Sequence, residues 1–145
     1  MSSEALDRVR GQIGRCGIWC GSCAVGNGSI ADLALRLRSS LTTYDAPQWI
    51  SLRTPWESFL GDLASLETSV ACVGCLRGGG RTPCEMQTCA PQKGVTSCTV
   101  CASFPACEHA EILQHMRSGA VDAGLTVLVP GEDPIDMIRR GTPGA

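Results

Sequence analysis

Hydrophobic residues first recur at helical spacing in the middle of the chain. Ile30, Leu33, Leu37 and Leu41 lie three or four positions apart, which is the spacing of one face of an α-helix. Ser29 stands just before them, and serine is common at the start of a helix. The pattern therefore predicts a first core helix that begins near Ser29.

A second helix is predicted from the same kind of pattern. Trp56, Phe59, Leu60 and Leu63 lie at positions i, i+3, i+4 and i+7. The residue before them is a proline, which fits the first position of a helix because its missing N–H would have no partner there. We expect this helix to span residues 55–66.

The C-terminal third carries shorter patterns. Apolar residues at helical spacing predict a helix over residues 108–116, and the apolar, β-branched run 125–129 is typical of a strand. Residues 134–140 are expected to form a final helical turn. These elements predict a fold that is either α+β or mainly α.

The segment 73–105 differs from the rest of the chain. It is rich in glycine and proline and carries few large apolar side chains, so it cannot build a conventional core. Structural zinc contributes on the order of 10–16 kcal/mol, which is comparable with the whole stability of an ordinary domain. Bound metal would therefore decide whether this segment folds.

Together the patterns predict one small domain over residues 1–145. In it, packed helices from 29–66 and 108–140 adjoin a loop-rich, cysteine-ligated metal module formed by 16–23 and 72–107.

Charge and hydrophobicity argue against nucleic acid and membrane as partners. The net charge is −2 and Lys93 is the sole lysine, so the cationic surface that nucleic acid requires is not expected. No stretch has the roughly 20 apolar residues of a membrane span, and the polar N-terminus does not look like a signal peptide. We therefore expect the protein to be cytoplasmic. Thiols stay reduced in the cytoplasm.

Cysteines are the most informative residues, because reduced thiols in clusters are typical of metal ligands. The chain has ten, all of them candidate ligands: Cys16, Cys20, Cys23, Cys72, Cys75, Cys84, Cys89, Cys98, Cys101 and Cys107. Three Cys-x2-Cys pairs occur among them, and such a pair allows both sulfurs to reach one ion while backbone N–H groups donate to the thiolates.

The spacing suggests how the cysteines divide into two sites. Cys72/Cys75 and Cys98/Cys101 are separated as in a four-cysteine zinc ribbon. A second metal would then bind the first cysteine group, and its fourth ligand would come from the remaining thiols: Cys84, Cys89 or Cys107. Four thiolates suit zinc and a 4Fe-4S cluster alike, so both cofactors stay open.

Several other residues are candidates for chemistry. Cys84 and Cys89 are the pair expected to be left over if two sites use eight thiolates, and as free thiols they would be redox-active, complete a cluster or simply pack. His109 lies close to Cys107 and could bind metal, although a single helical histidine is more often a surface residue; the same holds more strongly for His115. Glu85 and Glu108 flank cysteines, where a carboxylate could orient a ligand, although most carboxylates are simply solvated.

Trp19 is expected to shield the metal site, because it lies inside the first cysteine group. No Ser/His/Asp set, phosphate loop or dinucleotide fingerprint is present, so no catalytic residue is predicted.

The ordered cysteine pattern resembles a known family. The motifs that carry the resemblance are Cys16-Gly-Ile-Trp-Cys20-Gly-Ser-Cys23, Cys72-Val-Gly-Cys75, Cys84 through Cys89-Ala, Lys93-Gly94-Val95, and Cys98-x2-Cys101-x2-Phe104-Pro105 with Cys107. Over roughly residues 12–117 they are similar to the cysteine-rich domain-of-unknown-function family 3795 (DUF3795) of bacteria and archaea. The sequence departs from the family pattern in having Ala106 between Pro105 and Cys107.

The resemblance implies a metal-binding protein and supplies no substrate. Combined with the residues, it gives two expectations for function. The first is a zinc-binding protein that acts as an accessory or protein-interaction module with a protein partner. The second is an iron–sulfur or thiol-based protein of redox chemistry or metal handling, with or without catalysis.

Overall fold

The computed structural model describes residues 3–69 and 72–142 and is mainly helical, which confirms the mainly α alternative. The chain divides into two compact units. We call Ala24–Ala71 the arm, and Met1–Cys23 together with Cys72–Ala145 the cysteine unit. Each unit is described below by itself.

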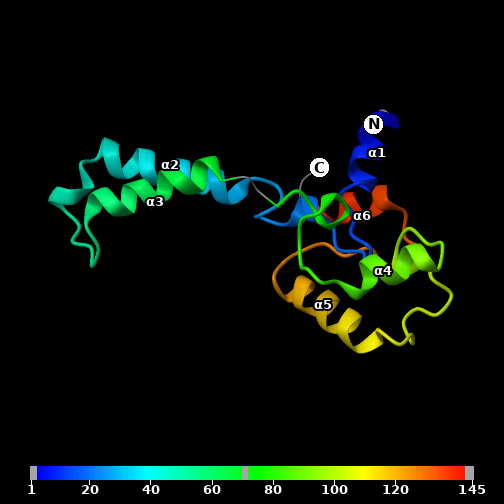
Figure 1. Ribbon diagram of the computed structural model, residues 1–145. Coiled ribbons are helices and arrows are strands. Elements are labelled where there is room, and N and C mark those ends of the chain that lie inside the picture. The colour runs from blue at the N-terminus through cyan, green and yellow to red at the C-terminus, as the bar shows by residue number, and fades with distance from the viewer. Residues whose placement is uncertain (1–2, 70–71, 143–145) are drawn as a thin grey trace. The chain divides into compact units, whose positions relative to one another are not determined.

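The arm is a pair of helices. Helix α2 (Ser29–Thr43) and helix α3 (Trp56–Thr68) lie side by side, joined through a short 3-10 turn at Ala46–Gln48 (Figure 1). Both were predicted from their periodic apolar residues, although Ser29 is the first helical residue and Gly28 is the N-cap. The buried apolar residues described in the arm are Ala34, Ala46 and Leu63.

The outward side of α2 differs from its prediction. Leu33 is 64% exposed and Leu37 is 46% exposed, so the prediction that both belong to a core face is wrong. Within the arm, α3 is the only long helix that packs on α2, and one neighbouring helix covers only a narrow stripe of side chains. Arg38 and Glu67 form a bidentate ion pair across the two helices.

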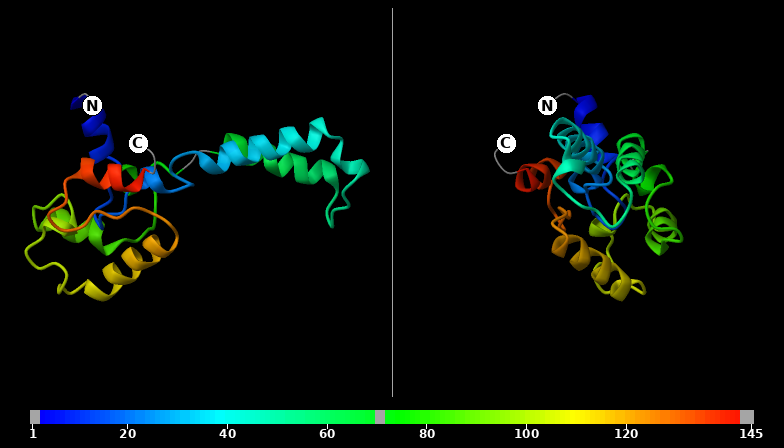
Figure 2. Two further views of the ribbon diagram at one scale, coloured as in Figure 1. Left: turned by 180° about the vertical axis from the view of Figure 1, so that it is seen from behind. Right: turned by 90° about the vertical axis from the view of Figure 1, so that its left-hand side faces the viewer.

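The described residues of the cysteine unit form four α-helices. They are α1 (Ser3–Arg10), α4 (Glu85–Gln92), α5 (Ala110–Asp122) and α6 (Pro134–Gly141). Figure 2 shows α4 and α5 in the same unit as the N-terminal helix and α6. The pattern predicted α5, although it continues beyond residue 116, and α6; helices α1 and α4 were not predicted.

Residues 125–129 do not form the predicted strand. In the described part of the chain their pairing is limited to an isolated antiparallel bridge between Ile18 and Val127. The Trp19 N–H donates to the Thr126 carbonyl at 2.9 Å, and the Leu128 N–H donates to the Gly17 carbonyl at 2.8 Å. Gly17 has a φ of +87°, so the backbone turns away and the pairing ends after one bridge.

Two small cores stabilise the cysteine unit. Ile13 and Leu128 pack with Met137, which is fully buried in the first core. The second core contains Cys16, Met86 and Leu113, and two more cysteines pack against it. Three of the ten cysteines, Cys16, Cys84 and Cys98, therefore take part in the apolar core.

Among the described residues, no helix combines the length and apolar composition that a membrane crossing requires.

Candidate metal centre

All ten cysteines are free thiols in the cysteine unit. Cys16 is buried, and the other nine are partly buried. They come from the N-terminal segment, from the loop before α4, from α4 itself and from the turns between α4 and α5. The fold therefore brings thiols together from segments that are far apart in the sequence.

The first cluster, group A, consists of Cys20, Cys23, Cys72 and Cys75. Burial raises the pKa of the Cys20 thiol, and the nearby thiols of the other three members raise it further. The backbone N–H of Cys75 donates to the Cys20 sulfur and acts in the opposite direction. A backbone N–H aimed at a sulfur is the arrangement that supports a metal-bound thiolate.

The two Cys-x2-Cys pairs of group A have different backbones. Cys20–Ser22 forms one 3-10 turn, in which the Cys23 N–H donates to the Cys20 carbonyl at 3.0 Å. The Cys72/Cys75 pair lacks this turn, because Gly74 adopts a φ of +87° and a 3-10 turn begins only at Cys75. The expected tight turn thus lies between the two cysteines of the Cys20/Cys23 pair, whereas in the Cys72/Cys75 pair it begins at the second cysteine.

The second cluster, group B, consists of Cys89, Cys98, Cys101 and Cys107. All four line one small apolar cavity, which Met86, Phe104 and Leu113 close from the interior. Burial raises the pKa of Cys98 to about 11, with further contributions from Cys16 and the other three members. Cys98 and Cys101 form the ends of a 3-10 turn in which the Cys101 N–H donates to the Cys98 carbonyl at 3.1 Å.

Cys16 lies between the two groups. Burial raises its pKa, an N–H bond from Ile18 lowers it, and the thiols of Cys75 and Cys84 raise it. Cys16 also lies close to Cys98, because the Cys98 N–H donates to the carbonyl of the preceding residue, Arg15, at 2.7 Å. Cys16 therefore lies near one member of each group: Cys75 of group A and Cys98 of group B.

This grouping differs from the one expected from spacing. The ribbon hypothesis paired Cys72/Cys75 with Cys98/Cys101, whereas in the structure the neighbours of Cys20 include Cys72 and Cys75. The neighbours of Cys98 come instead from α4 and from the turns that follow it. In the sequence α4 lies between the two pairs, and its Cys89 lines the same cavity as Cys98 and Cys101.

The two thiols outside the four-cysteine groups are also not the expected pair, Cys84 and Cys89. Cys89 lies in group B, whereas Cys84 packs beside Cys16 in the second core. If the two groups hold four thiolates each, Cys16 and Cys84 are the remaining pair.

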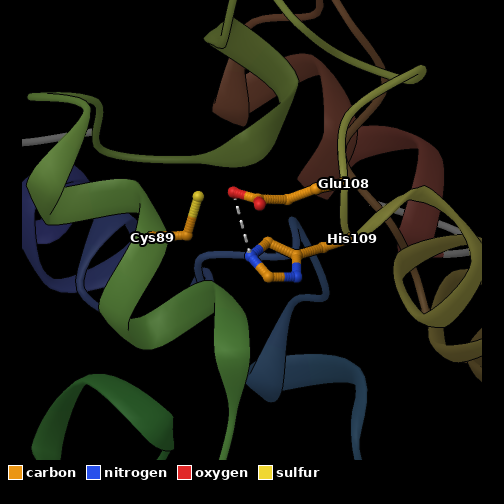
Figure 3. A group of neighbouring side chains, drawn as sticks. All are labelled: Cys89, Glu108 and His109. Carbon is orange, nitrogen blue, oxygen red and sulfur yellow. Dashed lines mark ion pairs between the residues drawn. The ribbon is translucent and has the colours of Figure 1, made fainter.

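A further set of ligand atoms lies at the edge of group B. The side chains of Cys89, Glu108 and His109 have ligand atoms within 4.8 Å of one another (Figure 3). Cys89 extends from α4, whereas the other two come from the segment just before α5. Sequence inspection had named each residue separately, but nothing in the spacing brought the three together.

Among the other candidates of this kind, Glu85 borders the same surface hollow as Cys89, Glu108 and His109. His115 and Glu85 are exposed, and neither belongs to this set of ligand atoms. Trp19 packs against the core of Ile13 and Leu128, and its indole N–H donates to Gln12 at 3.2 Å.

Arg117 is an important residue that the sequence did not reveal. From α5, its guanidinium donates to the Cys16 carbonyl at 2.6 Å and to the Leu128 carbonyl at 2.8 Å. It also lies over the Phe104 ring, 5.4 Å from its centroid. Burial lowers the pKa of Arg117, while the thiols of Cys16 and Cys98 act in the opposite direction. A cation is thus held close to thiols that would be negative in a metal complex.

Replacing Gly14 with alanine is expected to weaken metal binding. A Cβ at this buried position would lie 3.0 Å from the Cys75 sulfur and 3.6 Å from the Cys16 sulfur. The Cys75 side chain would have to move, so we expect metal affinity to fall about tenfold, or roughly 1.4 kcal/mol. Competition with a chelator measures this change. Gly119→Ala is the control, since nothing lies within 4 Å of its added Cβ; equal losses in both variants would contradict the explanation.

The metal-free protein is expected to lose stability in alkaline solution. The pKa of Cys98 is raised to about 11, and burial also raises those of Cys16 and Cys20, whereas unfolded thiols titrate near 9. Between these values the unfolded chain binds fewer protons than the folded chain, so stability falls as the pH rises from about 9 to 11. Urea titrations with chelator and reductant should give a lower midpoint at pH 10 than at pH 8; an unchanged midpoint would argue against buried neutral thiols.

Comparison with known families adds one finding. The model of a family described as "Protein of unknown function (DUF3795)" matches residues 12–112, which include all ten cysteines. No curated protein and no solved structure matches the chain. The chain therefore belongs to the DUF3795 family, as its cysteine pattern had suggested.

Proposed function

We propose that this protein binds two metal ions, one in group A and one in group B, and that zinc is the metal. The observation that carries the proposal is that Cys20 has three other thiols as neighbours and that four thiols, Cys98 among them, line one cavity. Four thiolates complete the tetrahedral shell of a structural zinc site and leave no position open for a substrate.

The surroundings of the thiols support this proposal. Apart from Cys89 on α4, the cysteines of both groups lie in turns and loops, and bound zinc is a source of order for such segments. Arg117 offsets part of the negative charge that four thiolates would bring into the interior. The ten thiols are free, which suits the reducing cytoplasm expected from the sequence.

An iron–sulfur cluster is the second candidate, and one observation favours it. Within the described residues, no three cysteine sulfurs come within 4.8 Å of one another. Four sulfurs around one zinc ion lie about 3.8 Å apart, because each Zn–S bond is about 2.3 Å long. A four-iron cluster attaches each thiolate to a different iron and so spans a wider gap.

The proposed biological role is that of an accessory module that binds a protein partner. The arm supports it with large apolar side chains that face solvent: Trp49 is 80% exposed, Tyr44 75% and Leu33 64%. Aromatic residues of this kind are enriched at the centres of protein interfaces. A photo-crosslinker at position 49 should trap one discrete partner in cells, whereas one at the exposed Glu57 should not; identical products from both positions would count against this role.

Metal analysis tests the binding proposal directly. Protein purified without oxygen should contain two zinc ions per chain and be colourless. Iron with acid-labile sulfide and visible absorption would favour the second candidate and would replace zinc as the metal. Protein that carries neither metal, and takes up neither on reconstitution under reducing conditions, would overturn the metal-binding proposal.

A further inference from the structure

Cys89, Glu108 and His109 form a set of ligands that the two four-cysteine groups do not explain. Their ligand atoms lie within 4.8 Å of one another, and the His109 Nε2 is 3.7 Å from a Glu108 carboxylate oxygen. Cys89 is fixed by helix α4, whose buried Met86 and Ala90 anchor it to the core. The other two residues are adjacent in the sequence, and His109 is the N-cap residue of α5. Two packed helices therefore determine where the three groups meet.

The set differs from groups A and B in its exposure. The Glu108 side chain is 73% exposed and the His109 side chain is 27% exposed. All three residues border an open surface hollow that Arg81, Gln87 and Lys93 also line. Cys89 and His109 line the apolar cavity of group B as well. Cys89, Glu108 and His109 thus lie at the border between the cavity of group B and solvent.

The donor atoms indicate which kind of ion would fit. One thiolate, one imidazole and one carboxylate make up the mixed sulfur, nitrogen and oxygen shell that zinc accepts, whereas calcium and magnesium prefer oxygen alone. Three protein ligands leave the fourth tetrahedral position for water. The thiolate and the carboxylate together balance the charge of a divalent ion.

We propose that Cys89, Glu108 and His109 form a third, exchangeable site for a divalent ion of the zinc class. The Cys89 sulfur is shared with group B as a bridging thiolate, and in this respect the third site rests on the proposed function. Binding takes place with neutral His109 and ionised Glu108 and releases the Cys89 thiol proton to solvent, unless group B has already displaced it. The ion exchanges because it faces solvent and one of its ligands is water.

Cobalt(II) alone serves as the probe, because it occupies zinc sites and absorbs visible light. The experiment begins with protein as purified, washed with a weak chelator that removes exposed ions only. The wild type should bind one further Co²⁺ per chain with visible absorption bands. His109→Gln and Glu108→Gln should each reduce its affinity at least tenfold. His115→Gln is the matched control and should bind the ion like the wild type, because His115 is exposed elsewhere on α5.

The possible results separate the third site from groups A and B. Failure of the wild type to bind the extra ion, or unchanged binding by His109→Gln, would overturn the third site even if two tightly held metals are present. Extra Co²⁺ that depends on His109, in protein lacking both tightly held metals, would support the third site and contradict the proposed function instead. Equal metal content of the two tight sites in all variants excludes unfolding as the cause of a loss.

Discussion

Cys72→Ser is expected to remove one of the two tightly bound metal ions, Cys98→Ser the other, and the double variant both. The reason is that Cys72 belongs to group A and Cys98 belongs to group B. Each structural zinc site contributes on the order of 10 kcal/mol, so the double variant should also lose most of the ordered structure of the cysteine unit. Metal content per chain and circular dichroism measure the two effects.

This experiment separates the observed grouping from the ribbon hypothesis. If Cys72 and Cys98 held the same ion, the double variant would lose only one ion and would match each single variant. Cys84→Ser is the control, since Cys84 packs beside Cys16 outside both groups and its loss should leave two ions bound. One ion retained by the double variant would show that the grouping of the thiols is wrong.

Arg117→Met is expected to destabilise the metal-free protein by about 3–5 kcal/mol. The Arg117 guanidinium donates to the carbonyls of Cys16 and Leu128, and a charged hydrogen bond of this kind contributes about 1.5–3 kcal/mol. Methionine fills much of the same volume over Phe104 but leaves both carbonyls without their donor. The change should appear as a lower urea midpoint at constant slope.

Two further variants test this explanation of Arg117. Arg139→Met removes an arginine whose side chain is 75% exposed and bound only to Asp136 among the described contacts, so its effect should stay within about 0.5 kcal/mol. Arg117→Lys keeps the charge but has one donor group in place of the planar fork, and should fall between wild type and Arg117→Met. Similar stability in all three variants would contradict a specific role for Arg117.

The sequence was a good guide to the helices of the arm. Leu33, Leu37, Phe59 and Leu63 recur at helical spacing, and the chain is helical at all four. The same periodicity did not reveal which side is covered, because exposure depends on how many neighbours a helix has. Leu63 is buried, whereas Leu33 is 64% exposed.

Helix α4 shows why the cysteine unit was harder to predict. It is short and contains Pro91, a residue that ordinarily argues against a helix. Its stability comes instead from burial of Met86 and Ala90 in contacts that the local sequence does not reveal. Without α4, the position of Cys89 and therefore the composition of group B could not be predicted.

The identity of the cysteines as a set was easier to predict than their grouping. Clustered thiols are conspicuous in any sequence, but the distance along the chain does not fix which of them meet in space. That depends on contacts such as the Cys98 N–H bond to Arg15 and the space left by Gly14. Arg117 could not be predicted for the same reason, since its partner Cys16 is 101 residues away in the sequence and Leu128 lies beyond the end of α5.

The pairing of Leu128 with Gly17 has a consequence for synthesis on the ribosome. Chains emerge from their N-terminus, so all ten cysteines are made before the segment that joins the first of them to the C-terminal core. If groups A and B bind metal as proposed, a chain interrupted before residue 117 would already carry all ten cysteines but lack the Arg117 hydrogen bonds to the carbonyls of Cys16 and Leu128.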